Sequence, residues 1–159
     1  MSSSMELNQK PLECQTNLQT LVQLPFLSGM PLEAVKLLAY LCRRQTFRPG
    51  QTIFRQDEPD PNAYVILSGK ARFLLETPQE ILLTEIGEMD FVGGLSLFCE
   101  MNRNYTLRAE TEVVCLTLSR EKFQKALERY PDIGPRLYEA VSRSIIRWGA
   151  HFVREHLAK

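Results

Sequence analysis

The spacing of hydrophobic and polar positions divides the chain into a helical beginning, a strand-rich middle and a helical end. Residues 18–42 carry apolar side chains three or four positions apart, with breaks at Pro25 and at Ser28-Gly29. This pattern predicts a short helix, a turn and a second helix over residues 32–42. The first ten residues of the chain, MSSSMELNQK, are polar and are expected to be frayed.

Between Arg43 and Leu118 the pattern changes to short apolar runs separated by turn signals. Strands are predicted on both sides of Pro49-Gly50, and Gly69 ends a third. DEPDPN at residues 57–62 predicts a loop, because two prolines and four acidic or amide residues cannot build a strand ladder. Seven or eight short strands at this spacing favour a sandwich or barrel over a parallel sheet.

The last forty or so residues return to helical spacing. Ser119 is a predicted N-cap for a helix that ends near Pro131, and a long second helix follows with Pro135 in its first turn. Five apolar residues repeat every three or four positions along this last helix: Leu137, Val141, Ile145, Trp148 and Phe152.

Composition limits the class of protein. A chain of 159 residues is one domain with a sizeable core, and its 19 basic and 19 acidic residues balance, which argues against a broad nucleic-acid footprint. Its four cysteines are widely spaced without a C-x-x-C pair, which favours reduced thiols in a cytoplasm. No apolar run approaches the roughly 20 residues of a membrane span.

The chain shows no catalytic signature. It has no G-x-S-x-G motif, no P-loop and no paired-carboxylate motif, and Cys14 alone cannot hold an iron–sulfur cluster. Its two histidines, His151 and His156, lie about 140° apart around a helix and cannot chelate one metal together. We therefore expect no enzyme activity and no metal site, and the residues identify no cofactor.

One stretch, DFVGGLSLFCEMNRNYTLRA at residues 90–109, has the parts of an anion pocket. Gly93 and Gly94 permit a tight turn, and a short helix after them would present free N–H groups. Arg103 follows, with a planar guanidinium that matches the oxygens of a phosphate. The alternative is a turn required by backbone geometry alone, with Arg103 at the surface or paired with a carboxylate such as Glu100.

Residues 47–73, 82–94 and 91–111 together resemble the cyclic-nucleotide-binding domain of the bacterial catabolite-activator and protein-kinase-regulatory families. The resemblance implies a mainly β, α+β fold: a double-stranded β-helix (jelly-roll) barrel flanked by N-terminal helices and a long C-terminal helix. It covers residues 25–159, preceded over residues 1–24 by a polar segment and a short helix. It implies a cyclic nucleotide, or another phosphate-bearing compound, as the ligand. The implied phosphate cassette consists of Gly93, Gly94, Leu95, Ser96, Arg103, Asn104 and Tyr105.

The sequence departs from this family at Gly94, where nucleotide-binding members usually hold a glutamate that accepts a hydrogen bond from the ribose 2′-hydroxyl. Losing a hydrogen bond to a charged acceptor costs about 1.5–3 kcal/mol. Asn104 and Tyr105 replace small residues, and Tyr105 either fills the cavity or faces outward. We expect cyclic-nucleotide binding to be weak, altered or lost, and Gly94→Glu to improve it if the pocket is otherwise open.

The last helix carries two further expectations from the resemblance. Trp148 is either a lid over the base or a plain core or dimer-seam residue, and Leu137, Val141, Ile145, Trp148 and Phe152 are the candidate seam of a homodimer. The alternative is that this same face packs on the chain's own barrel.

Three functions remain open. The first is a standalone bacterial regulatory module in the cytoplasm, read by an unidentified protein partner. The second is a structural interaction or dimerisation domain with a filled pocket. The third is the sensory half of a DNA-binding regulator. The chain as it stands lacks a recognition helix and is not expected to bind DNA by itself.

Overall fold

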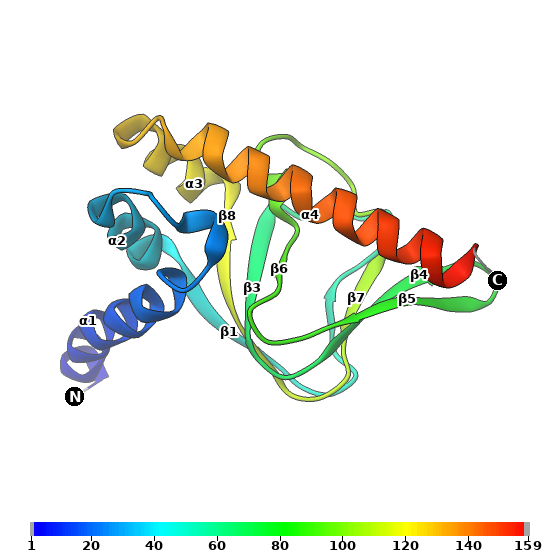
Figure 1. Ribbon diagram of the computed structural model, residues 1–159. Coiled ribbons are helices and arrows are strands. Elements are labelled where there is room, and N and C mark those ends of the chain that lie inside the picture. Colours follow the sequence, from blue (N-terminus) through cyan, green and yellow to red (C-terminus); the bar gives the residue numbers. More distant parts are fainter. Residues whose placement is uncertain (1, 158–159) are drawn as a thin grey trace.

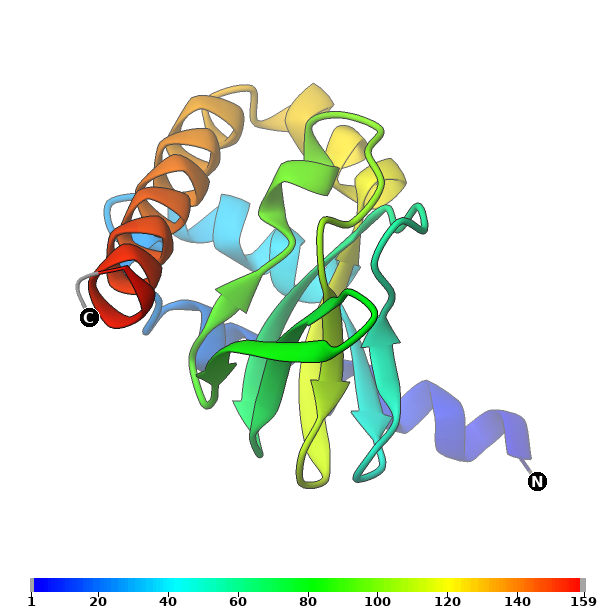
Figure 2. The ribbon, with the colours of Figure 1, turned by 90° about the vertical axis from the view of Figure 1, so that its right-hand side faces the viewer.

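Two antiparallel four-stranded sheets form the centre of the molecule in the computed structural model, which describes residues 2–157. One sheet has the strand order β1-β8-β3-β6 and the other β2-β7-β4-β5. They face each other across a shared interior and form a jelly-roll barrel (Figure 2). The strands are β1 (Arg43–Phe47), β2 (Thr52–Phe54), β3 (Asn62–Ser68), β4 (Ala71–Glu76), β5 (Glu80–Ile86), β6 (Phe91–Val92), β7 (Thr106–Ala109) and β8 (Val113–Ser119).

The predicted strands and turns are confirmed, including the loop before β3 and the glycine stop after it. The two-residue strand β6, which pairs with β3, was not predicted because it is too short to show an alternation. The barrel interior holds a cluster dominated by aromatic and β-branched side chains, with Phe54, Tyr64, Phe73 and Leu107 among its buried members.

The helices lie at one end and along one side of the barrel (Figure 1). They are α1 (Ser2–Leu21), η1 (Pro25–Leu27), α2 (Leu32–Leu41), η2 (Gly94–Leu97), α3 (Arg120–Arg129) and α4 (Ile133–His156). The prediction for α2 is confirmed. The expectation of a frayed start followed by a short helix was wrong, because α1 begins at Ser2 and runs unbroken through Pro11.

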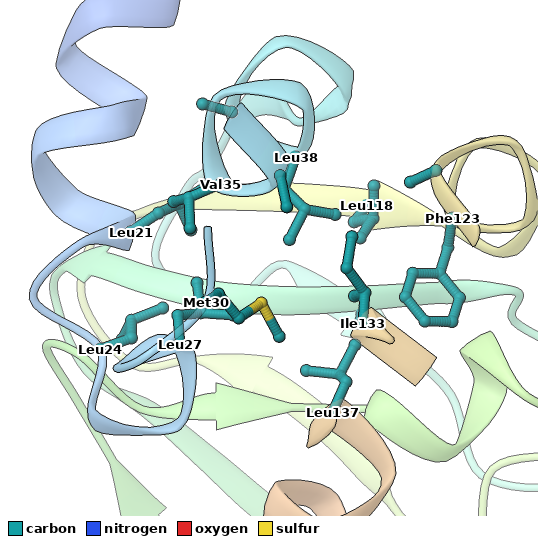
Figure 3. Packing of buried hydrophobic residues seen from close by; sticks show 14 of the residues in the cluster. Leu21, Leu24, Leu27, Met30, Val35, Leu38, Leu118, Phe123, Ile133 and Leu137 are labelled. Carbon is teal, nitrogen blue, oxygen red and sulfur yellow. The ribbon is translucent and has the colours of Figure 1, made fainter. Parts of the chain in front are cut away.

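A second, mostly aliphatic core joins the helices to the β1-β8-β3-β6 sheet. Its labelled members in Figure 3 come from α1, η1, α2, β8, α3, the start of α4 and the connections on either side of η1, and they point toward one another. Phe123 of α3 and Ala34 of α2 are fully buried there. This core fixes the first turns of α4 against the barrel.

The predicted cap and first-turn proline are confirmed. The Ser119 hydroxyl accepts a hydrogen bond from the Lys122 N–H at 3.3 Å, and Pro135 lies in the first turn of α4. From there α4 passes along the barrel, and its last turns lie near β4 and β5 (Figure 1). None of the helices within residues 2–157 combines the length and the apolar character that crossing a membrane requires.

The assignment of Leu137 and Val141 to a dimer seam was wrong. Both are buried in their own chain, with 3% and 4% of their surface exposed, because this face of α4 packs on the barrel and the aliphatic core. Trp148 packs on the aromatic cluster of the barrel, whereas Ile145 and Phe152 keep part of their surface exposed.

Candidate functional site

The cassette turn depends on the backbone conformation of Gly93 and on hydrogen bonds from Arg120. Gly93 has φ +77°, a left-handed conformation that glycine adopts without strain, and a Cβ there would lie 2.8 Å from Arg103 Nη2. After this turn comes η2, and Arg120 binds one carbonyl within it and one just after it: its Nε donates to Ser96 O at 2.6 Å and its Nη2 to Cys99 O at 3.2 Å. These two hydrogen bonds hold the backbone of the cassette against the start of α3.

Arg103 points into the molecule and is 4% exposed. Its Nη2 donates to Asp60 Oδ2 at 3.1 Å and to the Asn62 carbonyl, and its Nη1 donates to the Gly93 carbonyl at 3.4 Å. The guanidinium also lies 4.3 Å from the centre of the Phe54 ring. Its carboxylate partner is thus Asp60, across 43 residues of sequence, and not the nearby Glu100.

Asp60 is held firmly in place by three donors. Besides Arg103, its carboxylate accepts hydrogen bonds from the Asn62 N–H at 3.1 Å and from the Tyr64 hydroxyl at 2.8 Å. Burial, reinforced by the Asp60 charge, raises the pKa of Tyr64 well above its usual range, so this hydroxyl remains a donor. The charge of Arg103 is therefore compensated within the chain, and an incoming anion must compete with Asp60.

Sequence reasoning missed the role of Asp60. The loop that contains it was interpreted only as a break between strands. The aspartate in the EPDP run, which is part of the family resemblance, was a signal for a functional role of this loop. Nothing local indicated that the loop would contact Arg103, 43 positions away.

Gly94 lies directly under α4. A Cβ on Gly94 would collide with Val141 Cγ2 and would lie 2.7 Å from Phe91 Cε1. The missing glutamate is therefore not a simple gap, because the space into which a side chain would extend is occupied by α4 and by the Phe91 ring. The expectation that Gly94→Glu improves binding required an otherwise open pocket, and Val141 and Phe91 lie where that side chain would begin, so it stays a prediction.

Aromatic rings fill the part of the barrel beyond the cassette. Tyr105 immediately precedes β7 and packs edge-on against Phe73, with 4.6 Å between ring centres. Trp148 of α4 contacts Phe73 with 5.3 Å between ring centres, and Phe54 lies 6.2 Å from Tyr105. Burial raises the pKa of Tyr105. Tyr105 thus faces inward and fills space, and Trp148 is a half-buried residue that packs on this cluster.

Three cavities are lined in part by Trp148. One of about 720 Å³ lies between η1, residues 89–91 and α4 and does not include Arg103. Two smaller ones lie around the aromatic rings. The cassette cavity measures about 170 Å³ and is lined by Gly93, Gly94, Arg103, Tyr105, Val141, Trp148 and their neighbours. The aromatic cavity measures about 260 Å³ and lies between β4, β5 and the second half of α4. Tyr105, Ile145 and Trp148 line both cavities. Typical small-molecule pockets have about 300–1,000 Å³, so neither of these two cavities alone reaches the usual size for a nucleotide.

The remaining predicted cassette residues are brought to the same place but differ in exposure. Leu95 is half-buried and lines the cassette cavity, and Asn104 is exposed on its rim. Ser96 is fully buried, and its N–H already donates to the Gly93 carbonyl at 3.2 Å. Among the described residues no group of histidine, cysteine or acidic side chains has a metal-binding arrangement.

A barrel of this topology, closed by a glycine turn, a buried arginine and a long final helix, defines a cyclic-nucleotide-binding-like domain. The family model for the cyclic nucleotide-binding domain matches residues 44–130. The chain therefore belongs to the cyclic nucleotide-binding domain family.

Relatives with this domain include a transcriptional regulator and the neuropathy target esterase sws of Drosophila. The chain is 29% identical over 121 residues to the CRP-like cAMP-activated global transcriptional regulator of Mycobacterium tuberculosis, an alignment that covers 75% of the chain and 54% of the regulator. The chain thus spans about half the length of that relative.

Two solved structures show the same architecture. The catabolite activator protein of Thermus thermophilus superposes with a TM-score of 0.69 at 26% identity, over 84% of this chain and 63% of that one. The regulatory subunit of a cAMP-independent protein kinase A from Trypanosoma brucei superposes with a TM-score of 0.71 at 26% identity, over 86% and 48% of the two chains.

Proposed function

We propose that this chain is a regulatory, non-catalytic module of a bacterial cytoplasm in which cyclic-nucleotide binding is weak, altered or lost. The observation that carries the proposal is the contact between Gly94 and α4. The position that should present an acceptor to the ribose has no side chain, and Val141 occupies the space where one would extend. The acceptor for the sugar is absent, and the space that its side chain would take is filled by Val141.

The phosphate half supports the same conclusion. Arg103 is present and buried, but its guanidinium already bonds to Asp60 and to two backbone carbonyls. Binding a cyclic phosphate would require either release of Asp60 or burial of an anion beside a neutral pair, and both cost free energy. A related fold in a cAMP-independent kinase subunit shows that this architecture also occurs in a protein described as not depending on cyclic AMP.

Calorimetric titration of the purified chain with cyclic AMP, cyclic GMP and cyclic di-GMP tests this proposal. We expect no saturable heat below about 100 µM ligand, which corresponds to a binding free energy weaker than about −5.5 kcal/mol. A thermal-shift screen of nucleotides gives an independent measure, because a ligand that binds only the folded state raises the melting temperature. Micromolar binding of cyclic AMP would show that the glutamate is dispensable here.

A second function, a protein-interaction or homodimerisation domain with a filled pocket, is favoured by a specific observation. Aromatic side chains fill the barrel, and α4 together with Leu157 just after it leaves a row of large apolar residues partly exposed. These exposed residues are Tyr138, Ile145, Ile146, Phe152, Val153 and Leu157. Sedimentation velocity over a range of concentrations tests homodimerisation: a monomer at 100 µM would count against it.

A third function, the sensory half of a DNA-binding regulator, is supported by the relative from Mycobacterium tuberculosis, of which the alignment covers 54%. Reading the gene beyond codon 159 tests it. A helix-turn-helix segment in frame would favour this function, and a stop codon would favour one of the other two.

A further inference from the structure

The aromatic cavity is built for an apolar, flat occupant. Phe73 and Leu83 from the barrel and Trp148 and Phe152 from α4 form most of its wall. Gly149 also lines it, and nothing lies within 4 Å of a Cβ built there, so the helix leaves open space at this point. A dry cavity of about 150 Å³ is enough to hold benzene, so about 260 Å³ accommodates a two-ring aromatic compound.

The unused polar groups around the two cavities are mainly hydrogen-bond donors. Arg103 Nε is buried and has no hydrogen-bond partner among the described residues. The Tyr105 hydroxyl and the Trp148 indole N–H, in the wall shared by both cavities, likewise make no hydrogen bond within the described part of the chain. Arginine and tryptophan can only donate, and tyrosine donates readily. The Tyr105 hydroxyl can also accept, as can the Asn104 amide on the exposed rim. The other polar side chains of the lining already make contacts of their own: Thr84, Ser144 and His151.

The charge at the site is already balanced. Asp60 compensates Arg103, so a second anion would be buried beside a neutral pair, at a cost. A neutral carbonyl oxygen can instead accept from the remaining donors without adding charge. Ribose hydroxyls would find no carboxylate at Gly94.

We propose that the neighbouring cassette and aromatic cavities, which share Tyr105, Ile145 and Trp148 in their walls, together bind an uncharged, flat aromatic compound that carries a carbonyl acceptor and no sugar. The ring system lies between Phe73 and the second half of α4, and the carbonyl turns toward Arg103, Tyr105 and Trp148. This inference rests on the proposed function, because it names the ligand class that replaces a cyclic nucleotide in the altered site. It also links binding to α4, since five residues that line the aromatic cavity belong to that helix: Ile145, Trp148, Gly149, His151 and Phe152.

The test uses three probes on the full chain, measured by isothermal titration calorimetry: 2-acetonaphthone, which is neutral, 2-naphthoate, which has a similar shape but is charged, and cyclic AMP. We expect saturable binding of the ketone, binding of the carboxylate at least about tenfold weaker, and none of the nucleotide. Equal affinity for ketone and carboxylate would overturn the claim that charge excludes anions.

A plug variant locates the site. Gly149→Leu extends a side chain into the aromatic cavity from a helical position where leucine is a better helix former than glycine, so the fold is not expected to suffer. Ala150→Leu, at the adjacent exposed position, is the matched control. The plug is expected to weaken ketone binding at least about tenfold and the control to leave it unchanged. Unchanged binding in Gly149→Leu would place the ligand elsewhere and overturn the proposal.

The outcomes distinguish failure of the proposed ligand class from failure of the proposed function. If neither naphthalene probe nor cyclic AMP binds, the ligand class proposed here is wrong, while weak or lost nucleotide binding stands. If cyclic AMP binds at micromolar concentration, the proposed function fails together with this inference.

Discussion

The two halves of α4 differ in how they are held. In the first half, Ile133 and Leu137 belong to the aliphatic core and Val141 lies over Gly94 of the cassette, and all three are 2–4% exposed. Among the described residues after Val141, no side chain of the helix is fully buried, and Ile146 is 70% exposed. Trp148, packed on Phe73, is the main contact of the second half with the barrel. One continuous helix thus combines an anchored segment with a lightly held one.

The boundary between the two halves falls at the candidate site. Val141 is the last buried residue of α4, and it is the one that meets Gly94. Both cavities lie from this point onward, under the lightly held half. A ligand that enters them would therefore act on the part of α4 that costs least to move, which is the requirement for a helix that reports binding.

The largest expected effect is on the anchored half. Leu137→Ala should lower the free energy of unfolding by about 2–5 kcal/mol, because it leaves a cavity in the aliphatic core. Urea denaturation measures the change, and Val153→Ala in the second half is the matched control, expected within about 0.5 kcal/mol. Similar losses for both variants would remove the distinction between the two halves.

A smaller effect is expected at the boundary. Gly94→Glu should cost about 1–3 kcal/mol, because its side chain collides with Val141 and Phe91. Adding Val141→Ala should recover part of this loss, so that the double variant is more stable than the sum of the single changes predicts. A double-mutant cycle by urea denaturation gives the coupling energy.

Additivity in that cycle would mean that the contact is not the source of the cost. The same double variant also tests the site, since it alone has both a carboxylate and space for a ribose. Cyclic AMP should bind it more tightly than either single variant.

Removing the contact between Trp148 and Phe73 should lower the free energy of unfolding only modestly and loosen only the second half of α4. Trp148→Ala is expected to cost about 1–2 kcal/mol, less than the 3–5 kcal/mol typical of a fully buried aromatic residue. Hydrogen exchange followed by mass spectrometry should show faster exchange over residues 145–156 and no change over residues 133–141. Uniform acceleration along the whole helix would instead indicate that α4 moves as one body.

The smallest effect on stability is expected on the exposed side. Ile146→Ser should change the free energy of unfolding by less than about 0.5 kcal/mol, because Ile146 makes few contacts in its own chain. If α4 forms a homodimer interface, the same variant should weaken self-association several-fold in sedimentation equilibrium. Unchanged self-association would show that Ile146 is not part of a homodimer interface.

Local features of the fold were predictable because their causes are local. Strand alternation, the Ser119 cap and the first-turn position of Pro135 each depend on a few neighbouring residues. The cassette was also predictable, since its glycines and Arg103 lie within eleven positions of one another.

The contacts that decide what the cassette can bind were not predictable. The Asp60–Arg103 pair and the approach of Val141 to Gly94 each join residues more than forty positions apart, and their existence depends on sheet register and on the path of α4. Which face of α4 packs inward was left open for the same reason. A repeat of apolar residues shows that a face is buried but does not say what covers it.

The close seating of Val141 on Gly94 also bears on how such a domain evolves. A glutamate introduced at position 94 meets a methyl group already in place, and a smaller residue at position 141 alone only opens a hole. Either single step is penalised, so a carboxylate can be accommodated at position 94 only through two coordinated changes. Substitutions at these two positions are therefore expected to accumulate together and not one at a time.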